Sequence, residues 1–571
     1  MVTRVLVPDE TGGWLVFTEP REILTATSPD KVVEVLARAE SAAQQGFHVA
    51  GYVTYEAASA FDAALAHHPA GPLPLLSFGV FNAPQPATIN IQEEVTILLE
   101  PDLPRSDYER SLNRIRGFLA DGDTYQVNFT QQMRGRLHGK AESLMAQLAQ
   151  VQPTPYAMMI ESSEHIIFSI SPELFFERNG NRLRTEPMKG TRPRGRFIEE
   201  DQLQYESLAG SGKDRAENLM IVDMIRNDLG RIAATGSVHV DEMFRIRALP
   251  TVWQQVSSVS AETGAGLPDI FSALFPCASV TGAPRARTME IISELESGPR
   301  GVYTGAVGMI RPGGDCTFAV AIRTLLLDKE TAEASYGVGG GIVWDSDTEE
   351  EWQEALVKAS VLGASRPDFQ LFETMRFEVA RGFQGLDYHM NRLTGSAKYF
   401  DFSCPQAEIR LALDDFQCAD DCRVRLLLDR HGAFTLEQSP LPESSEPVRL
   451  RIASAPVDSQ DVFLFHKTTH RTVYDEAKAS ADDCDDVLLF NEKGELTETS
   501  IANVFLEIEG QLLTPPVSSG LLAGTLRQAM LDSGEAKEAI LKLGDLERAD
   551  GVFVANSLRG LRRAIVLSNS Q

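Results

Sequence analysis

Residues 336–360 read YGVGGGIVWDSDTEEEWQEALVKAS, a strand-like run followed directly by a helical pattern. In the helical part Glu351, Glu354 and Lys358 stand at positions i, i+3 and i+7, so all three share one helix face. The same alternation recurs toward the N-terminus, where runs such as HIIFSI, GAVGMI and FAVAIRTLLL lie between amphipathic helical segments. This alternation predicts one large α/β body.

The segment KDRAENLMIVDMIRNDL, residues 213–229, also predicts a helix. Glu217, Ile221, Met224 and Asp228 fall on one stripe of it. A carboxylate on a largely apolar stripe needs a cation, a donor or a metal, unless it marks the solvated edge of that stripe. For the acidic helix at 345–360, the ordinary alternative is a surface ion pair worth about 0.3 to 0.5 kcal/mol. Neighbouring motifs must decide between these interpretations.

The sequence pattern changes at GASRPDFQ, residues 363–370, where Gly, Ser and Pro end one helical pattern and a second domain is expected to begin. We therefore expect two domains, residues 1–365 and residues 366–571. The second contains strand-like runs such as VRLLLD, VRLRIA, DVLLFN, NVFLEIEG and GVFVAN, with helical patterns at YDEAKAS and GTLRQAMLD. The predicted fold class is α/β and α+β.

Composition excludes several classes of partner. The 571 residues include 53 Lys+Arg and 81 Asp+Glu, for a formal net charge of -28. Nucleic acid or anionic lipid would require a basic patch, and the sequence shows none. No window reaches 18 consecutive apolar residues, so no membrane span is expected. The six cysteines are sparse and form no CxxC pair, which favours a reducing cytoplasm.

Several further motifs flank the two acidic helices in a fixed order. They are SISPELFF (169–176), RTEPMKGTRPRG (184–195), FPCASVTGAPR (275–285), RGVYTGAVG (300–308) and AIRTLLL (321–327). Together, over about residues 110–360, they resemble the chorismate-utilising enzymes, the family of anthranilate synthase, isochorismate synthase and aminodeoxychorismate synthase component I.

The resemblance implies roles for particular residues. Glu217 and Glu354 would hold Mg²⁺, which in turn would hold the ring carboxylate of chorismate, and a hard cation suits two carboxylates and waters. Glu173 would be the general acid that protonates the departing 4-hydroxyl. Four more side chains are implied to contact the substrate, namely Tyr303, Arg323, Lys358 and Thr281.

Lys189 in PMKGT distinguishes between two activities within the family. By the resemblance, enzymes that make aminodeoxychorismate carry Lys at this position, whereas anthranilate synthases have Ala. The implied role is attack on C2 of chorismate, which requires a neutral amine and hence a lowered pKa. Gln126 stands where isochorismate synthases have a water-activating Lys, which disfavours hydroxyl transfer. Two positions depart from the family, since Gln254 replaces a His and Arg285 replaces the usual Lys. No glutaminase motif is present, so a separate glutamine amidotransferase is implied as the source of ammonia.

A second set of motifs occupies the C-terminal part. HMNRL (389–393), FLFHKTTH (463–470), DDVLLFNEKGELTETSIANVFLE (485–507), SGLLAGTLRQ (519–528) and VANSLRGL (554–561) resemble the fold-type IV pyridoxal-phosphate enzymes. By this resemblance Lys467 would form the Schiff base and Glu498 would face the pyridinium nitrogen. Arg392, with the backbone NH groups of Gly524 and Thr525, would bind the phosphate. Without the other motifs, Lys467 could equally belong to a surface cationic cluster.

The two resemblances together imply a bifunctional route to 4-aminobenzoate for folate. The first domain would aminate chorismate to 4-amino-4-deoxychorismate, and the second would eliminate pyruvate from that product. One alternative is an anthranilate-type first domain joined to an unrelated aminotransferase, and another is a non-catalytic chorismate-binding scaffold that recruits an amidotransferase. The second resemblance is also compatible with a homodimer formed through residues 366–571.

Overall fold

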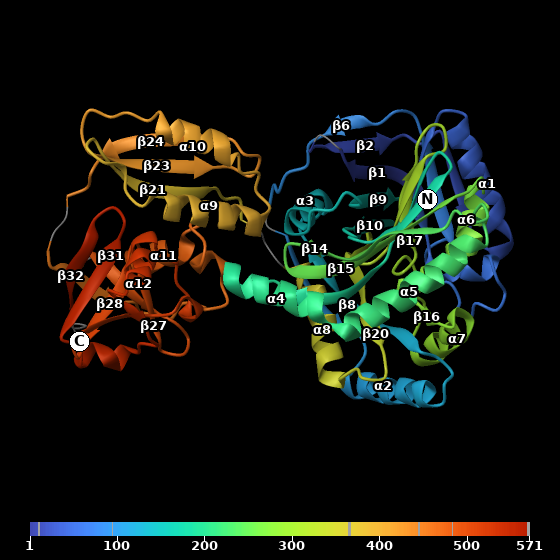
Figure 1. Ribbon diagram of the computed structural model, residues 1–571. Coiled ribbons are helices and arrows are strands. Elements are labelled where there is room, and N and C mark those ends of the chain that lie inside the picture. The colour runs from blue at the N-terminus through green and yellow to red at the C-terminus, as the bar shows by residue number, and fades with distance from the viewer. Residues whose placement is uncertain (10–11, 94, 364–366, 444–445, 482, 568–571) are drawn as a thin grey trace. The chain divides into compact units, whose positions relative to one another are not determined.

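The computed structural model describes residues 1–9, 12–93, 95–363, 367–443, 446–481 and 483–567 (Figure 1). It divides into two compact units, one of Met1–Pro193 and Tyr205–Arg366 and the other of Arg194–Gln204 and Pro367–Gln571. The boundary expected at 365–366 lies outside the described residues. The segment Arg194–Gln204 belongs to the second unit, which the sequence pattern did not predict. Helix α4 (Ile198–Gly210) therefore begins in one unit and ends in the other.

The first unit contains two ten-stranded sheets, and all their described strand pairs are antiparallel. One sheet has the order β16 (Gly282–Ala283), β8 (Gln126–His138), β20 (Glu333–Ile342), β19 (Thr324–Asp328), β10 (His165–Ser169), β9 (Met158–Ser162), β1 (Val2–Pro8), β2 (Trp14–Thr18) and β6 (Gln85–Ala87), with β7 (Thr96–Pro101) beside β8. The other has the order β13 (Met188–Pro193), β15 (Val252–Glu262), β12 (Arg182–Glu186), β11 (Leu174–Asn179), β18 (Cys316–Val320), β17 (Ala306–Ile310), β4 (His48–Val53), β5 (Leu76–Phe81) and β3 (Glu22–Ala26), with β14 (His239–Ala248) beside β15.

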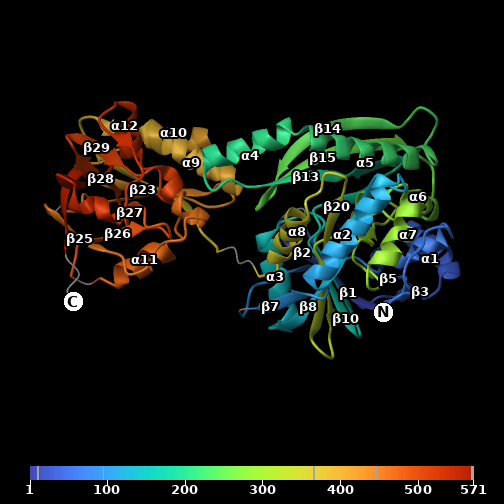
Figure 2. The same ribbon diagram turned by 90° about the horizontal axis from the view of Figure 1, so that it is seen from below.

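The two sheets pack face to face because apolar residues alternate along their strands. Their shared core includes Val5 of β1, Ile160 of β9, Ala50 of β4 and Val307 of β17. Helices cover the outer faces. The second sheet is covered by α1 (Pro29–Gln44), α5 (Gly212–Gly230) and α6 (Leu267–Leu274). The first sheet is covered by α3 (Ala141–Val151) and α8 (Thr348–Ser360). Two more helices, α2 (Arg105–Ala120) and α7 (Arg285–Leu295), pack against β8 of the first sheet. Figures 1 and 2 both show α5 running beside β14 and β15.

The helices expected at residues 213–229 and 345–360 are confirmed as α5 and α8. The side chain of Ser211 caps α5 by accepting from the backbone NH of Asp214. Asp347 caps α8 by accepting from the NH groups of Glu349 and Glu350. Both helices thus start with polar caps and acidic residues, and the negative charges interact favourably with the positive end of the helix dipole.

The second unit contains a four-stranded and an eight-stranded sheet. The first has the order β22 (Gly382–Phe383), β21 (Leu371–Glu378), β23 (Cys422–Leu428) and β24 (Phe434–Pro440). The second has the order β27 (Leu496–Thr499), β26 (Asp486–Phe490), β25 (Val448–Ile452), β32 (Gly560–Val566), β31 (Gly551–Asn556), β28 (Asn503–Ile508), β29 (Gln511–Thr514) and β30 (Lys537–Glu538). An extra pairing of Glu498 with Asn503 joins β27 to β28, so six strands form a closed ring.

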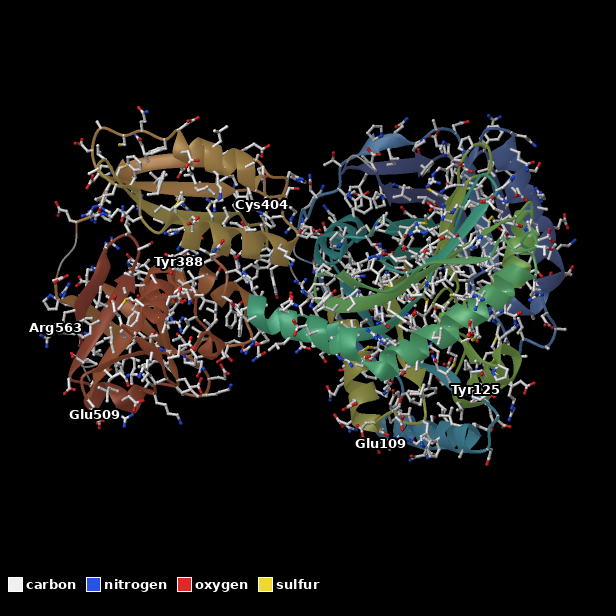
Figure 3. The ribbon with its side chains drawn as sticks, viewed as in Figure 1. Glu109, Tyr125, Tyr388, Cys404, Glu509 and Arg563 are labelled. Atoms are coloured by element: carbon white, nitrogen blue, oxygen red, sulfur yellow. The ribbon has the colours of Figure 1, made fainter. Side chains whose placement is uncertain are left out.

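Besides the first part of α4, the described part of the second unit contains the helices α9 (Leu386–Phe400), α10 (Gln406–Asp414), α11 (Thr472–Ala479) and α12 (Thr525–Asp532). α9 and α10 pack on the four-stranded sheet through an apolar cluster that includes Met390, Leu393 and Ile409. The hydroxyl of Tyr388, labelled in Figure 3, donates to Asp532 at 2.8 Å and ties α9 to α12. Both units are mixed α/β, as expected. Among the described helices, none combines the length and the apolar character needed to cross a membrane.

Candidate active sites

Lys189 lies on β13, and the backbone next to it is fixed by contacts with the neighbouring strand β15. Gln254 of β15 donates from Nε2 to the carbonyl of Gly190 at 2.9 Å and accepts from the hydroxyl of Thr191 at 3.1 Å. The residue that replaces the family His therefore fixes the strand next to Lys189. Gly190 has a φ of 92°, and a Cβ there would lie 2.9 Å from the Cβ of Asp214, so only glycine fits without strain.

The amine of Lys189 lies among charges contributed by several elements. Burial lowers its pKa, and the ammonium of Lys358 lowers it further. The carboxylates of Glu217, Glu173 and Glu354 act in the opposite direction. The net effect is a lowered pKa, which is the direction that a nucleophilic amine requires.

Gly341 of β20 lies against this amine. A Cβ on Gly341 would be 2.7 Å from Nζ of Lys189 and 2.5 Å from Nε2 of Gln126, so a larger residue would displace both side chains. Gln126 of β8 is fully buried, yet neither polar atom of its amide has a hydrogen-bond partner. Because buried polar groups are normally paired, the amide of Gln126 is available to a molecule bound beside Lys189.

Glu173 precedes β11 and is buried. Its Oε1 accepts a 2.6 Å hydrogen bond from the hydroxyl of Ser279. Burial raises the pKa of Glu173 to about 7, although Ser279 and the charge of Lys189 oppose the rise. A carboxyl group with a pKa near neutrality can hold and release a proton at physiological pH, as a general acid must.

Glu217 of α5 lies close enough to Glu354 of α8 for the charge of Glu354 to favour the protonated form of Glu217. Burial raises the pKa of Glu217, although the charges of Lys189 and Lys213 oppose this. Lys358 lowers the pKa of Glu354, with which it forms an ion pair of 2.6 Å, although burial opposes this. Lys358 also donates to the carbonyl of Gly339 at 2.8 Å.

The expected metal ligands have the right chemistry for a hard cation. No cluster of three or more His, Cys, Asp or Glu side chains in the described parts of the chain is arranged for metal binding. Mg²⁺ commonly uses one or two carboxylates and completes its shell with water and substrate. Glu217 and Glu354 fit this requirement in donor type, and Glu354, with a side chain 48% exposed, is accessible from solvent.

Glu351 adds a carboxylate near Glu354. Burial and the charge of Glu354 raise the pKa of Glu351. The charge of Lys213 acts on Glu217, Glu351 and Glu354 alike. Lys213 is not among the site residues predicted from the sequence, where its one signal is its position one turn before Glu217 on the helix.

The structure places the remaining substrate-contact residues as follows. The ring of Tyr303 packs on Gly337, where a Cβ would lie 2.2 Å from two ring atoms. Arg323 has a φ of 49°, which is unusual for a residue with a side chain, and burial lowers the pKa of its guanidinium. No carboxylate in the described structure pairs with Arg323, so its charge is available to an anion. The hydroxyl of Thr281 donates to the backbone carbonyls of Cys277 and Ala278.

Arg285, which replaces the usual Lys of the family, has a partner in the structure. Arg285, at the start of α7, forms an ion pair with Asp228 of α5. Both side chains are largely buried. The pair joins α7 to the helix that carries Glu217, so Arg285 acts in the structure as a link between helices.

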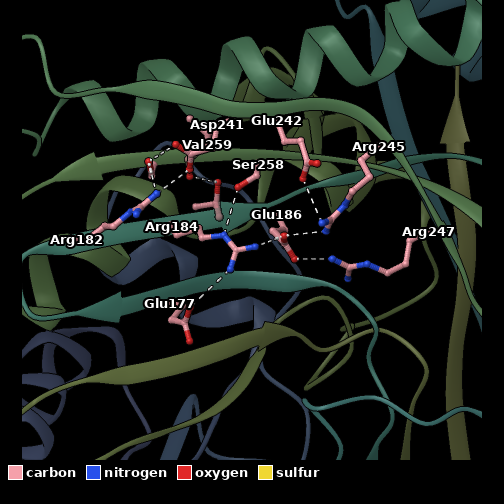
Figure 4. Close-up of polar contacts among 12 residues, drawn as sticks. Glu177, Arg182, Arg184, Glu186, Asp241, Glu242, Arg245, Arg247, Ser258 and Val259 are labelled. Carbon is pink, nitrogen blue, oxygen red and sulfur yellow. Dashed lines mark hydrogen bonds and ion pairs between the residues drawn. The ribbon is translucent and has the colours of Figure 1, made fainter. Parts of the chain in front are cut away.

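A separate charged cluster lies on β12, β14 and β15 (Figure 4). The carboxylate of Glu186, whose side chain is 2% exposed, accepts from Arg247 at 3.0 Å and contacts Arg184 and Arg245. Glu177 and Glu242 lie on the outer sides of Arg184 and Arg245. The three arginines are thereby balanced by three carboxylates, and the cluster fixes the sheet beside β13.

In the second unit, a cavity of about 350 Å³ is lined by all five residues that the sequence analysis proposed for the cofactor. They are Lys467, Glu498, Arg392, Gly524 and Thr525. Nζ of Lys467 lies 4.6 Å from the ring centroid of Phe372. Burial and the charge of Arg392 lower the pKa of Lys467 to about 8, so a sizeable fraction of the amine is neutral near neutral pH.

Glu498 is held by three donors on different elements. Its Oε1 accepts from the hydroxyl of Tyr474 at 2.8 Å and from the NH of Leu522 at 3.0 Å, while its Oε2 accepts from Asn503 at 3.3 Å. Burial raises the pKa of Glu498 to about 7, although these bonds and Lys467 oppose the rise. A fixed, buried carboxylate of this kind can partner a protonated ring nitrogen.

Arg392 has a partner that the sequence analysis missed. Glu373 of β21 accepts from Nε of Arg392 at 2.9 Å and from Nη2 at 2.6 Å, and it also contacts Nδ1 of His389 at 2.7 Å. Although burial acts in the opposite direction, Arg392 and His389 hold the pKa of Glu373 down to about 2. Nη1 of Arg392 donates to the carbonyl of Ala523, just before the helix α12.

Gly524 is the N-cap of α12, and a Cβ there would lie 1.9 Å from Oδ1 of Asn503. The hydroxyl of Thr525 lies 3.3 Å from Nε2 of His389. The helix N-terminus and Arg392 therefore meet at one side of the cavity, an arrangement suited to a phosphate. The residues present fit pyridoxal phosphate.

Comparison with known proteins agrees with this geometry. Residues 84–363 match the model of chorismate binding enzymes, and residues 370–565 match amino-transferase class IV. The chain joins a chorismate-binding enzyme domain to a class IV aminotransferase domain. We refer to them as the chorismate-binding domain and the aminotransferase domain. The class IV domain implies pyridoxal phosphate as cofactor, and the other domain implies chorismate as substrate.

Curated relatives of the chorismate-binding domain carry two different activities. Aminodeoxychorismate synthase component 1 of Klebsiella aerogenes is 39% identical over 280 residues, which are 49% of this chain and 61% of the relative. An anthranilate synthase component 1 of Haloarcula marismortui is also 39% identical, over 46% of this chain and 54% of the relative. The chain thus spans little more than half the length of these relatives. Because the identity to both relatives is equal, it does not indicate which ring position of chorismate is aminated. Only the residues of the site bear on that question.

A solved structure supports the fold of the first domain. Anthranilate synthase component I of Streptococcus pneumoniae superposes with a TM-score of 0.52 and 22% sequence identity. The match covers 64% of this chain and 91% of that one. At this identity the likeness concerns the fold alone.

Proposed function

We propose that the chain converts chorismate and ammonia into 4-aminobenzoate and pyruvate in two steps, for use in folate synthesis. The chorismate-binding domain makes 4-amino-4-deoxychorismate, and the aminotransferase domain releases pyruvate from it. The observation that carries the proposal is the meeting of Lys189, with its lowered pKa, and the buried acid Glu173 in one site. The presence of both domains in one chain supports the proposal that the product of the first step is the substrate of the second.

In the first step, the neutral amine of Lys189 attacks C2 of chorismate while Glu173 gives its proton to the 4-hydroxyl. The ring double bonds shift and the hydroxyl leaves as water. Ammonia then adds at C4, the double bonds return, and the C2–N bond to Lys189 breaks, which frees the neutral amine. The new C4 ammonium group gives a proton back to the carboxylate of Glu173. The sum is chorismate plus ammonia giving aminodeoxychorismate plus water. The unpaired amide of Gln126 lies where it can bind a substrate or ammonia atom beside Lys189.

Mg²⁺, when bound, would offset the negative charge of the substrate carboxylate in this acidic protein. Glu217 and Glu354 would hold it. Arg323 would bind a substrate carboxylate through its free guanidinium, and Tyr303, Thr281 and Lys358 would line the same site.

In the second step, pyridoxal phosphate supplies an electron sink for the elimination. Glu498, whose carboxylate is fixed by three donors, would face the ring nitrogen and favour its protonated form. Lys467 would hold the cofactor, and its amine would move the proton that elimination requires. Arg392 and the N-terminus of α12 hold the phosphate.

Three further proposals concern the setting of the enzyme. Ammonia comes from a glutamine amidotransferase subunit, since the sequence shows no glutaminase motif. The protein acts in the cytoplasm, and the aminotransferase domain forms a homodimer.

The test is product analysis from chorismate, ammonium and Mg²⁺, with and without pyridoxal phosphate. We expect aminodeoxychorismate without the cofactor and 4-aminobenzoate with it. Anthranilate, detected by its fluorescence, would instead support the anthranilate-type alternative. A Lys189→Ala variant addresses the scaffold alternative, because a scaffold would have no turnover to lose.

A further inference from the structure

Besides Arg471, which donates to the carbonyl of Ser500, three arginines on the wall of the aminotransferase cavity have no carboxylate partner among the described residues. Arg423, Arg425 and Arg559 all line the cavity that contains Lys467. Arg423 donates from Nε to the hydroxyl of Ser439 at 2.9 Å. The Nε atoms of Arg425 and Arg559 are buried and without any hydrogen-bond partner. The cavity is therefore strongly positive, and its charge exceeds what the pairs inside the protein neutralise.

The fold brings these arginines to one face. Arg423 and Arg425 alternate on β23, so both point away from the apolar core side, where Val424 and Leu426 are buried. Arg425 is paired in register with Thr374 of β21, which also lines the cavity. Arg559 lies in the turn between β31 and β32.

The turn that carries Arg559 lies beside β21. The backbone NH of Arg559 donates to Oδ1 of Asn556 at 2.9 Å, which fixes the turn. The hydroxyl of Ser557 lies 3.5 Å from the carbonyl of Thr374. Two separate parts of the second unit thus place guanidinium groups around one space.

The arginines are within reach of the reacting end of a substrate. Both Lys467 and Arg425 lie over the ring of Phe372, with Nζ of Lys467 at 4.6 Å and Cζ of Arg425 at 4.7 Å from its centroid. The two groups are therefore at most about 9 Å apart. A six-membered ring with substituents can bridge this distance.

The cofactor does not account for these three charges. Arg392 and the N-terminus of α12 serve the phosphate, and Glu498 serves the ring nitrogen. An apolar amino acid would leave guanidinium groups desolvated and unpaired, which is unfavourable. A carboxylate accepts two parallel hydrogen bonds from one arginine, so this wall suits a molecule with more than one carboxylate.

We propose that Arg425 and Arg559, assisted by Arg423, form a subsite that selects a cyclic amine bearing two carboxylates. The proposal rests on the proposed binding of pyridoxal phosphate at Lys467. It deepens the proposed function, since aminodeoxychorismate carries a ring carboxylate and an enolpyruvyl carboxylate. It also predicts that branched-chain amino acids are poor ligands.

The experiment compares two inert ligands on the full-length protein loaded with pyridoxal phosphate. 3-(Carboxymethoxy)benzoate has two carboxylates, and 3-methoxybenzoate has one on the same ring. Binding is followed by the change in visible absorbance of the bound cofactor, which reports only on the aminotransferase cavity. We expect the wild type to prefer the dicarboxylate by about ten- to a hundredfold, since a charged bidentate pair contributes about tenfold or more.

Arg425→Gln and Arg559→Gln should each remove most of this preference, while Arg425→Lys and Arg559→Lys should retain part of it. Arg381→Gln is the matched control, because Arg381 is a surface residue of the same unit with a side chain 75% exposed. Equal affinity of the wild type for both ligands would overturn the proposal, as would an unchanged preference in both Gln variants. If instead the preference is seen but added aminodeoxychorismate yields no pyruvate, the lyase assignment fails and the subsite stands.

Discussion

The hydroxyl of Ser279 donates to Oε1 of Glu173 across 2.6 Å, and both side chains are buried. This bond stabilises the carboxylate form of Glu173, whereas burial favours the protonated form and has the larger effect. The result is a carboxyl group with a pKa of about 7. Glu173 therefore depends on Ser279 to keep its acidity within the physiological range.

We predict that Ser279→Ala raises the pKa of Glu173 further. In a general acid, activity falls as pH rises through the pKa, so the basic limb of the pH profile should move to higher pH. One hydrogen bond to a charged group corresponds to a shift of about one pH unit. The measurement is kcat/KM for chorismate against pH, with ammonium in excess. Ser279→Thr keeps a hydroxyl and should leave the limb in place, whereas an unmoved limb in Ser279→Ala would remove Glu173 from the role of acid.

Gly341→Ala should strongly slow amination without unfolding the protein. The added Cβ would meet Nζ of Lys189 at 2.7 Å and Nε2 of Gln126 at 2.5 Å, so both side chains must move from the site. Misplacement of reacting groups by about 1 Å costs about a hundredfold in rate. Turnover of chorismate is measured beside pyruvate release from added aminodeoxychorismate, which should be unchanged. Gly117→Ala in α2 is the control, because its Cβ would have nothing within 4 Å. Full amination activity in Gly341→Ala would contradict the placement of the site.

Lys467→Ala should separate the two proposed reactions. Loss of the amine removes the covalent link to pyridoxal phosphate, so the visible absorbance of the protein should disappear. Chorismate should still be consumed, and aminodeoxychorismate should accumulate. Absorbance spectra and chromatography of the products check both statements. Lys478→Ala on the exposed surface of α11 provides a control of equal charge change. Undiminished 4-aminobenzoate formation by Lys467→Ala would rule out its role.

The sequence was sufficient to predict elements whose signal is local. The helical spacing of Glu217 and of Glu354 identified α5 and α8, and the motifs around Lys467 and Glu498 identified residues that do line one cavity. Contacts between distant segments had no such signal. Ser279 and Glu173 are 106 residues apart, and His389 and Thr525 are 136 apart. Their pairing depends on sheet order and helix packing, which local periodicity does not encode.

The segment Arg194–Gln204 illustrates the same limit. It follows the Lys189 motif directly, so sequence order assigned it to the first domain. In the structure its Arg196 donates to the carbonyl of Ser459, and its Phe197 stacks on Phe465 at 5.3 Å between ring centroids. Aromatic packing against a strand-rich unit far along the chain decides where it belongs. Only the three-dimensional arrangement reveals this.

The Glu186 cluster permits a prediction about stability. Glu186→Gln would keep the shape of the side chain but leave Arg184, Arg245 and Arg247 without their shared, buried anion. Removing one partner of a fully buried pair costs about 3 to 5 kcal/mol. Here the arginines are 31 to 40% exposed, so water screens them and the free energy of unfolding should fall by about 1 to 3 kcal/mol. Urea denaturation, followed with a probe in the first unit, measures the change. Asp241→Asn breaks the more exposed pair with Arg182 and should have an effect below about 1 kcal/mol. Equal stability of the Glu186→Gln variant and the wild type would show that the arginines are satisfied by water and their outer carboxylates alone.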